Sequence, residues 1–154
     1  MRIGSDVLTV EEPLEALEHA IQRLMVLEQK RLGALLAQHG LRIPEFFALV
    51  HLARCPDGCT MSALADELLQ SNATMTGIVD GLEAHQMVTR TRGTGPDRRT
   101  VVVQLTRPGR EFLKRSKEAR RQHLRRALES LPPHQVRVLV HLLDAYVHQL
   151  EETS

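Results

Sequence analysis

The first part of the chain carries a long helical pattern of hydrophobic residues. A hydrophobic stripe with three- and four-residue steps predicts one helix over residues 10–38, built on Leu14, Leu17, Ile21, Leu24, Leu32 and Leu35. Thr9 and Glu12 have the spacing of a capping box, and Gly40 is a typical residue for the helix end. An amphipathic helix this long in a chain of 154 residues needs a partner for its apolar face, such as another subunit.

Three shorter helices follow. The first begins near Pro44 and carries apolar residues through Leu52. The turn at 55–59 then leads to a short helix that Thr60 can cap. Ser71 can cap the third helix, which has an apolar face of Met75, Ile78, Val79 and Leu82.

The hydrophobic period then changes to that of β-strands. The β-branched runs 87–92 and 100–105 flank the basic, glycine-rich segment 93–99, which predicts a hairpin with a long basic tip. Thr106 can cap a helix over 107–129, and a last helix opens at Pro132-Pro133, with an apolar side of Val136, Leu139, Leu142, Leu143, Tyr146, Val147 and Leu150. The predicted fold class is mainly α with a small β-hairpin wing (α+β).

Charge is concentrated in the second half of the chain. The net charge is only +1, but residues 90–126 carry 13 Lys and Arg against three acidic residues. Such a block is typical of a surface that binds a polyanion, with nucleic acid first and an anionic membrane second. The alternative is a solvated helix face without a ligand.

Composition excludes several classes of protein. Aromatic residues make up 3% of the chain, too few for an aromatic-lined sugar site or a base-stacking platform. The longest clearly apolar stretch, 46–50, is far too short to cross a bilayer. The N-terminal residues contain no apolar segment of a secretory signal, and two cysteines fit a reducing compartment. We therefore expect a cytoplasmic protein.

The order of two short helices, a tight turn and a basic hairpin is that of a winged helix-turn-helix. The second helix of such a pair enters the major groove of DNA, so its first residues are the predicted base and phosphate contacts: Ser71, Asn72, Thr74, Met75 and Thr76. The wing offers Arg92, Arg98 and Arg99 to the DNA backbone or to a narrow minor groove.

These residues resemble the MarR family of transcriptional regulators over nearly the whole chain. The similarity lies in residues 64–68, residues 73–83, Asp97-Arg98-Arg99 in the wing, and the Leu-Thr-x-x-Gly motif that begins at Leu105. The resemblance implies that Asp97 orients Arg99 in the minor groove and that Arg98 lies near phosphate.

The resemblance also implies an assembly and a mode of regulation. Residues 1–40 and 107–154 would form a dimerisation region, and 41–106 a DNA-binding module. The homodimer would bind a pseudo-palindromic double-stranded operator, in most cases as a repressor. A small aromatic or anionic effector would release the DNA from a cleft for which the candidate lining residues are Arg23, Phe46, Phe47 and His51.

Four positions depart from the family pattern. Leu69 and Gln86 occupy turn positions where the family often has glycine. Conversely, Gly77 and Gly81 replace polar or basic residues in the predicted recognition helix, so a phosphate-binding arginine is missing at 81.

Two other groups of residues could have a functional role: the cysteine pair, and the same pair together with a histidine. Cys55 and Cys59 are four residues apart, so a redox-responsive regulator is one alternative, although packing as small apolar side chains is favoured. His51 could join them as metal ligands, but Pro56 and Gly58 interrupt any helix that would align the three, and a fourth ligand is missing. We therefore predict no metal and no cofactor.

The remaining alternatives are a functional histidine stripe, an enzyme and a helical adaptor. His134, His141 and His148 recur every seven residues, too far apart along one helix to chelate together, and indicate a solvated or dimer-facing stripe. The motifs of hydrolases, phosphate-binding loops and zinc peptidases are missing, so we predict no enzyme. A helical adaptor that binds no DNA would leave the basic hairpin without a role.

Overall fold

The computed structural model describes residues 8–92 and 100–153. The chain forms two compact units, Met1–Glu111 and Phe112–Ser154. The described part is mostly helical with one small antiparallel sheet, which confirms the predicted fold class.

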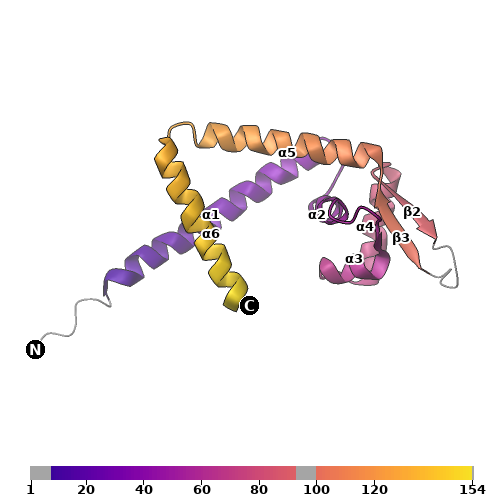
Figure 1. The fold of residues 1–154 in the computed structure, drawn as a ribbon, viewed down its shortest axis with the longest axis horizontal. Coiled ribbons are helices and arrows are strands. Elements are labelled where there is room, and N and C mark those ends of the chain that lie inside the picture. Colours follow the sequence, from indigo (N-terminus) through magenta and orange to yellow (C-terminus); the bar gives the residue numbers. More distant parts are fainter. Residues whose placement is uncertain (1–7, 93–99, 154) are drawn as a thin grey trace, which may run out of the picture. The chain divides into compact units, whose positions relative to one another are not determined.

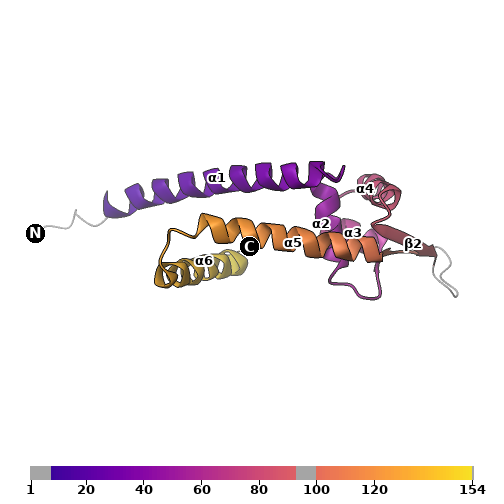
Figure 2. The ribbon, with the colours of Figure 1, turned by 90° about the horizontal axis from the view of Figure 1, so that it is seen from above.

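The first unit begins with a helix that is longer than any other described helix. Helix α1 spans Leu8–Ala37 without interruption (Figure 2). It starts before Thr9, so the predicted capping box of Thr9 and Glu12 is wrong: an N-cap residue must precede the helix, and Thr9 lies inside its first turn. Gly40, with a φ of +66°, follows the last turn as predicted.

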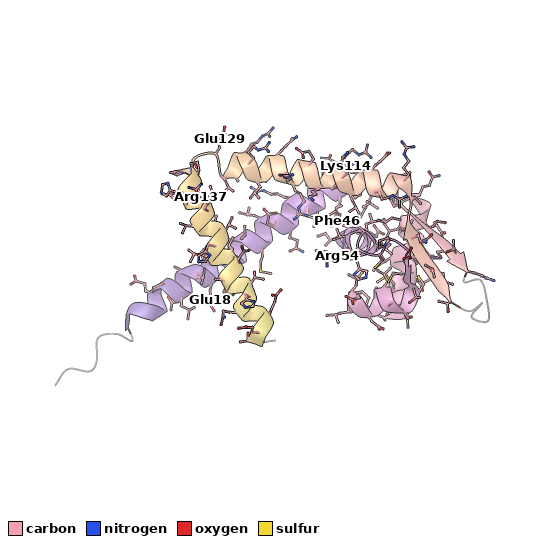
Figure 3. The ribbon with its side chains drawn as sticks, viewed as in Figure 1. Glu18, Phe46, Arg54, Lys114, Glu129 and Arg137 are labelled. Carbon is pink, nitrogen blue, oxygen red and sulfur yellow. The ribbon has the colours of Figure 1, made fainter. Side chains whose placement is uncertain are left out.

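Three shorter helices follow α1 along the chain; the first of them contacts α1, and the first and second both contact the third (Figure 1). They are α2 (Ile43–Leu52), α3 (Met61–Glu67) and α4 (Asn72–Ala84). Their inward faces form the core with α1 and the sheet, and the residues that are almost fully buried include Leu36, Leu49, Leu52, Leu64, Met75, Val79, Leu82 and Val103. Figure 3 shows Phe46 within this crowded group, whereas Glu18 lies on the part of α1 that extends away from it.

The sheet has three strands in the order β1-β3-β2. Strands β2 (Val88–Arg92) and β3 (Val101–Leu105) form the predicted hairpin. Strand β1 (Cys59–Thr60) pairs with the other side of β3, with Cys59 opposite Val103. The sequence did not predict β1, because a strand of two residues carries no alternating pattern.

Three predicted N-caps are confirmed by hydrogen bonds. The Thr60 hydroxyl accepts a bond from the backbone N–H of Ala63, at 3.2 Å. Ser71 caps α4 in the same way, and Thr106 caps α5 (Arg107–Ala127) by accepting a bond from the N–H of Gly109, at 3.1 Å. Local sequence chemistry therefore sets the start of each of these helices.

Two helices carry several exposed large apolar side chains each. On α1 these are Leu14, Leu17, Leu24, Met25, Val26 and Leu27. Helix α6 (Pro133–Thr153) has no buried residue, and large apolar side chains between Val138 and Leu150 are exposed. None of the helices within the described residues has the length and apolar character needed to cross a membrane.

Candidate nucleic-acid interface

The N-terminal turn of α4 is built around Ser71. The Ser71 hydroxyl accepts a hydrogen bond from the Thr74 N–H at 3.1 Å, and the two hydroxyl oxygens lie 2.8 Å apart. Both side chains are exposed. The free N–H groups and exposed hydroxyls make this turn suitable for an anion such as a phosphate.

The outer face of α4 presents small polar groups. Asn72 and Thr76 are both exposed, and the Thr76 hydroxyl donates to the backbone oxygen of Asn72 at 2.8 Å. Thr76 therefore offers its methyl group and a lone pair of its oxygen outward, while the Asn72 amide keeps both donor and acceptor groups.

Met75 does not belong to this face. From the sequence it was expected both in the apolar face of the helix and among the base contacts, and the structure leaves its side chain 0% exposed. A helix residue one position after Thr74 is turned by about 100° towards the core. Met75 is therefore a core residue, and the exposed candidate contacts at the start of α4 are Ser71, Asn72, Thr74 and Thr76.

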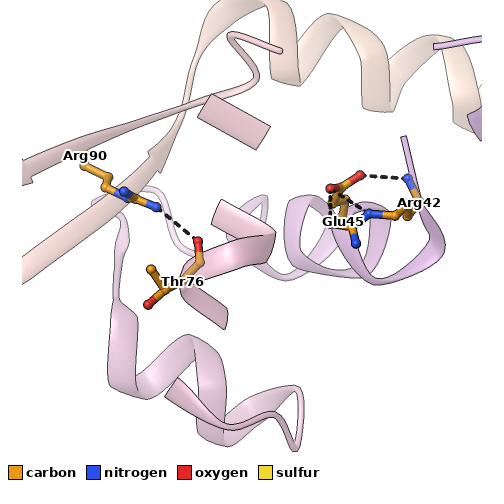
Figure 4. Close-up of polar contacts among 4 residues, drawn as sticks. All are labelled: Arg42, Glu45, Thr76 and Arg90. Carbon is orange, nitrogen blue, oxygen red and sulfur yellow. Dashed lines mark hydrogen bonds and ion pairs between the residues drawn. The ribbon is translucent and has the colours of Figure 1, made fainter. Parts of the chain in front are cut away.

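Arg90 on β2 fastens α4 to the wing. Its guanidinium lies 2.5 Å from Asp80 and 3.6 Å from Glu83. It also donates to the backbone oxygen of Thr76 at 3.3 Å, as Figure 4 shows. The Nε atom of Arg90 is buried without a hydrogen-bond partner among the described residues. Arg90 thus holds α4 against the hairpin.

In the sequence, Arg90 stands out only as part of the basic block. The sequence also contains an acidic pair that indicates a cationic partner. Asp80 and Glu83 are three residues apart on one face of the helix, and such a pair can share one cation. Only the pairing register of β2, however, shows that Arg90 lies on that side of the sheet.

We expect the Arg90→Ala variant to bind DNA more weakly while it keeps its fold. Asp80 and Glu83 are both more than 40% exposed, so these ion pairs contribute at most about 1 kcal/mol each to stability. The loss of orientation between α4 and the wing should act on binding instead. Urea unfolding and fluorescence anisotropy on the same preparation separate the two effects. A variant that binds as tightly as the wild type would show that Arg90 has no positioning role.

The described part of the wing ends in Arg92. Arg92 is exposed and pairs with Val101 across the hairpin, so it stands next to the wing tip. The other predicted wing contacts, Asp97, Arg98 and Arg99, lie outside the described residues.

A second ion pair lies at the start of α2, next to Gly81 of α4. The buried Glu45 carboxylate accepts hydrogen bonds from the Arg42 backbone N–H at 2.7 Å and from its guanidinium at 2.7 and 3.1 Å (Figure 4). These bonds and the charge of Glu45 raise the pKa of Arg42. A Cβ atom at Gly81 would lie 2.5 Å from Oε1 of Glu45, so close packing explains the glycine at 81. Gly77 has no atom within 4 Å of such a Cβ, and the structure gives no reason for it.

The four predicted effector-site residues do not line one cavity. A cavity of about 300 Å³ lies between α2 and the turn before α4, and its walls include Ile43, Pro44, Phe47, Leu68, Leu69, Gln70 and Ile78. Of the four, only Phe47 borders it. Phe46 is buried in the core, although its ring contacts that of Phe47 edge to face, with centroids 6.0 Å apart. Arg23 is exposed on α1, and His51 faces the two cysteines.

The cysteines and His51 lie together at the C-terminal end of α2. The His51 Nε2 atom is 3.8 Å from Sγ of Cys55 and 3.9 Å from Sγ of Cys59. Pro56 and Gly58 do interrupt the helix, but the turn itself returns Cys59 to His51 through its pairing with β3. Both thiols are free, and burial together with the neighbouring Cys55 raises the pKa of Cys59. A raised pKa makes Cys59 a poorer thiolate nucleophile for reaction with oxidants.

The histidine stripe is on α6, as expected from its spacing. His134, His141 and His148 are exposed, and Nε2 of His148 lies 3.4 Å from Glu152. The basic side chains of α5 are likewise exposed along most of its length.

Comparison with known proteins agrees with this architecture. The family model described as MarR family matches residues 39–100, a range that includes α2, α3, α4 and β2 and ends just before β3. No curated protein matches the sequence. A MarR family protein from Bacillus stearothermophilus has a TM-score of 0.74 and 25% identity, over 94% of this chain and 99% of that chain. The transcriptional regulator BldR from Sulfolobus solfataricus has a TM-score of 0.64 and 26% identity, over 91% and 97%.

One structural neighbour contains a nucleic acid. The MepR F27L mutant of S. aureus, bound to an oligodeoxyribonucleotide, has a TM-score of 0.66 and 18% identity, over 86% of this chain and 97% of that chain. This likeness concerns the fold. The family match over residues 39–100, together with the similarity of solved structures over nearly the whole chain, identifies this part of the protein as a helix-turn-helix region of the MarR family type.

Proposed function

We propose that the protein binds a double-stranded DNA operator through α4 and the wing, and represses transcription there. The observation that carries the proposal is the exposed polar turn of Ser71, Asn72 and Thr76 at the start of α4, held against a basic hairpin by Arg90. Asn72 has the donor and acceptor groups that recognise adenine in the major groove. Arg92, with Arg98 and Arg99 beyond the described part, supplies positive charge to phosphates or to the minor groove.

The acting species is a homodimer. The exposed apolar stripes of α1 and α6 support this proposal, because helices with so many large uncovered side chains bury them against another chain. Two copies of the module related by a two-fold axis recognise two half-sites about one helical turn apart, so the operator is a pseudo-palindrome.

A small aromatic or anionic effector releases the DNA. The cavity beside Phe47 supports this part of the proposal, because Leu68, Leu69 and Gln70 on its wall form the turn that leads into α4. An effector there releases DNA only if it binds better to a conformation in which the two recognition helices cannot reach both half-sites.

The test is a fluorescence-anisotropy titration with the DNA just upstream of the protein's own coding region, at two salt concentrations. Saturable, sequence-preferring binding that weakens steeply with salt is expected. Arg92→Ala and Arg99→Ala should each weaken binding and reduce the salt slope by about 1. Arg31→Ala is the matched control, because Arg31 is an exposed arginine on α1 paired with Glu28.

Two further arms complete the experiment. Asn72→Ala should cost about 1–3 kcal/mol of binding free energy on the preferred sequence and relax the preference at one base pair. Aromatic acids and an oxidant, added separately, identify the signal that releases the DNA. If no DNA binds at low salt, the DNA-binding proposal is overturned and the adaptor alternative takes its place.

A further inference from the structure

We propose that His51, Cys55 and Cys59 form a binding site for a thiophilic metal ion of the Zn²⁺ class. The three donor atoms, one imidazole nitrogen and two thiol sulfurs, all lie within 4.8 Å of one another. Within the described residues this is the one group of three or more potential ligand side chains that meets in this way. The three residues belong to the end of α2, the turn after it and β1, and none of them is among the α4 residues that we assign to DNA.

The distances match those of a tetrahedral centre. With Zn–S bonds of about 2.3 Å and Zn–N bonds of about 2.0–2.1 Å, a tetrahedral ion holds a nitrogen and a sulfur ligand about 3.6 Å apart. The two observed separations from Nε2 of His51 are 3.8 Å to Cys55 and 3.9 Å to Cys59. The two sulfurs lie within 4.8 Å of each other, and a tetrahedral ion would hold them about 3.8 Å apart, so side-chain rotation that brings them up to about 1 Å closer would complete the coordination.

The backbone around the donors is fixed by neighbouring structure. His51 lies in the last turn of α2, and Cys59 lies in β1, paired with Val103. Between them, the side chain of Gln104 donates to the backbone oxygen of Asp57 at 2.9 Å. Gly58 has a φ of +87°, and a Cβ there would lie 2.8 Å from the Val103 backbone oxygen. The loop is thus held on β3, so that two of the ligands are preorganised.

The donor set selects the class of metal. Two thiolates with one imidazole suit Zn²⁺ or Cu⁺, whereas Mg²⁺ and Ca²⁺ require oxygen ligands. All three side chains are half-buried, so one side of the site faces solvent and can take water or an outside ligand in the fourth position. Binding releases the two thiol protons and leaves the oxidation state of sulfur unchanged. The site would tie the end of α2 to the sheet that carries the wing.

The experiment uses the reduced full-length protein and Co²⁺ as a spectroscopic substitute for Zn²⁺. We expect one Co²⁺ per chain, a thiolate-to-cobalt charge-transfer band, and displacement of that band by one equivalent of Zn²⁺. Cys55→Ser and Cys59→Ser should abolish the band and weaken Zn²⁺ binding by more than about 100-fold, since even the loss of an outer-shell partner costs 10–100-fold. His141→Gln is the matched control, because His141 is an exposed histidine on α6.

A second measurement requires no substitution. Zn²⁺ should protect both thiols of the folded wild-type protein from alkylation by iodoacetamide, and it should raise the melting temperature of the wild type but not of Cys59→Ser. A cobalt complex without the charge-transfer band, a band that persists in Cys55→Ser, or thiols that alkylate equally fast with and without Zn²⁺ would each overturn the proposal. Loss of binding in His141→Gln alone would assign the metal to the α6 stripe and overturn it as well.

Discussion

Leu24→Asp is expected to separate the proposed dimer and to weaken operator binding by about 100- to 10,000-fold, because each monomer would then reach only one half-site and lose the gain from binding two sites at once. Leu24 is 52% exposed near the middle of the uncovered apolar stripe of α1, where a carboxylate would be buried against the partner chain. Sedimentation velocity gives the oligomeric state, and anisotropy on the same sample gives the affinity.

Gln22→Asp is the matched control for this experiment. The stripe meant here is the row of Leu14, Leu17, Ile21 and Leu24 along α1. Gln22 is also exposed on α1 but lies about 160° around the helix from Leu24, on the side of Val26, because successive residues turn by about 100°. The same charge is therefore introduced outside the stripe, and this variant should remain dimeric. A Leu24→Asp protein that sediments as a dimer would move the interface away from α1.

Gly109→Ala is expected to destabilise the protein by about 1–3 kcal/mol, the usual cost of overpacking. A Cβ at position 109 would clash with the backbone oxygen of Met87, well inside van der Waals contact. That oxygen already accepts hydrogen bonds from the Thr106 N–H at 3.0 Å and from its hydroxyl at 2.9 Å, so it cannot move freely. Urea unfolding followed by circular dichroism measures the change in the free energy of unfolding.

Gly77→Ala provides the contrast. Nothing lies within 4 Å of a Cβ at Gly77, which is exposed inside α4. Alanine there should raise the free energy of unfolding by about 0.5–1 kcal/mol through helix propensity. Equal effects of the two substitutions would show that the contact with Met87 is not what requires glycine at 109.

The Leu-Thr-x-x-Gly motif illustrates what sequence can predict. Thr106 was expected to cap a helix, and the structure shows both this cap and a second use of its hydroxyl, which also donates to the backbone oxygens of Gln86 and Met87. The cap depends on neighbours in sequence and could be predicted. The approach of Gly109 to Met87 depends on the packing of the first turn of α5 against the loop before β2, and no local pattern contains it.

The candidate site shows the same division. The helix order, the hairpin and the caps at Thr60 and Ser71 follow from spacing and residue type, because they are local. The ion pair of Arg90 with Asp80 depends on the orientation of a strand against a helix. The meeting of His51 with Cys59 similarly depends on β1, a strand too short to leave a pattern.

Left-handed backbone conformations occur in the turns at the two ends of α4. Leu69 and Gln86 have φ values of +51° and +57°, which cost non-glycine residues about 1–2 kcal/mol each. Both occupy turns where the family often has glycine, so the strain is not required by the fold. Leu69 is 91% exposed and has little packing to lose. Leu69→Gly is therefore the first substitution to make for a more heat-resistant form of the protein, for crystallography or for long titrations.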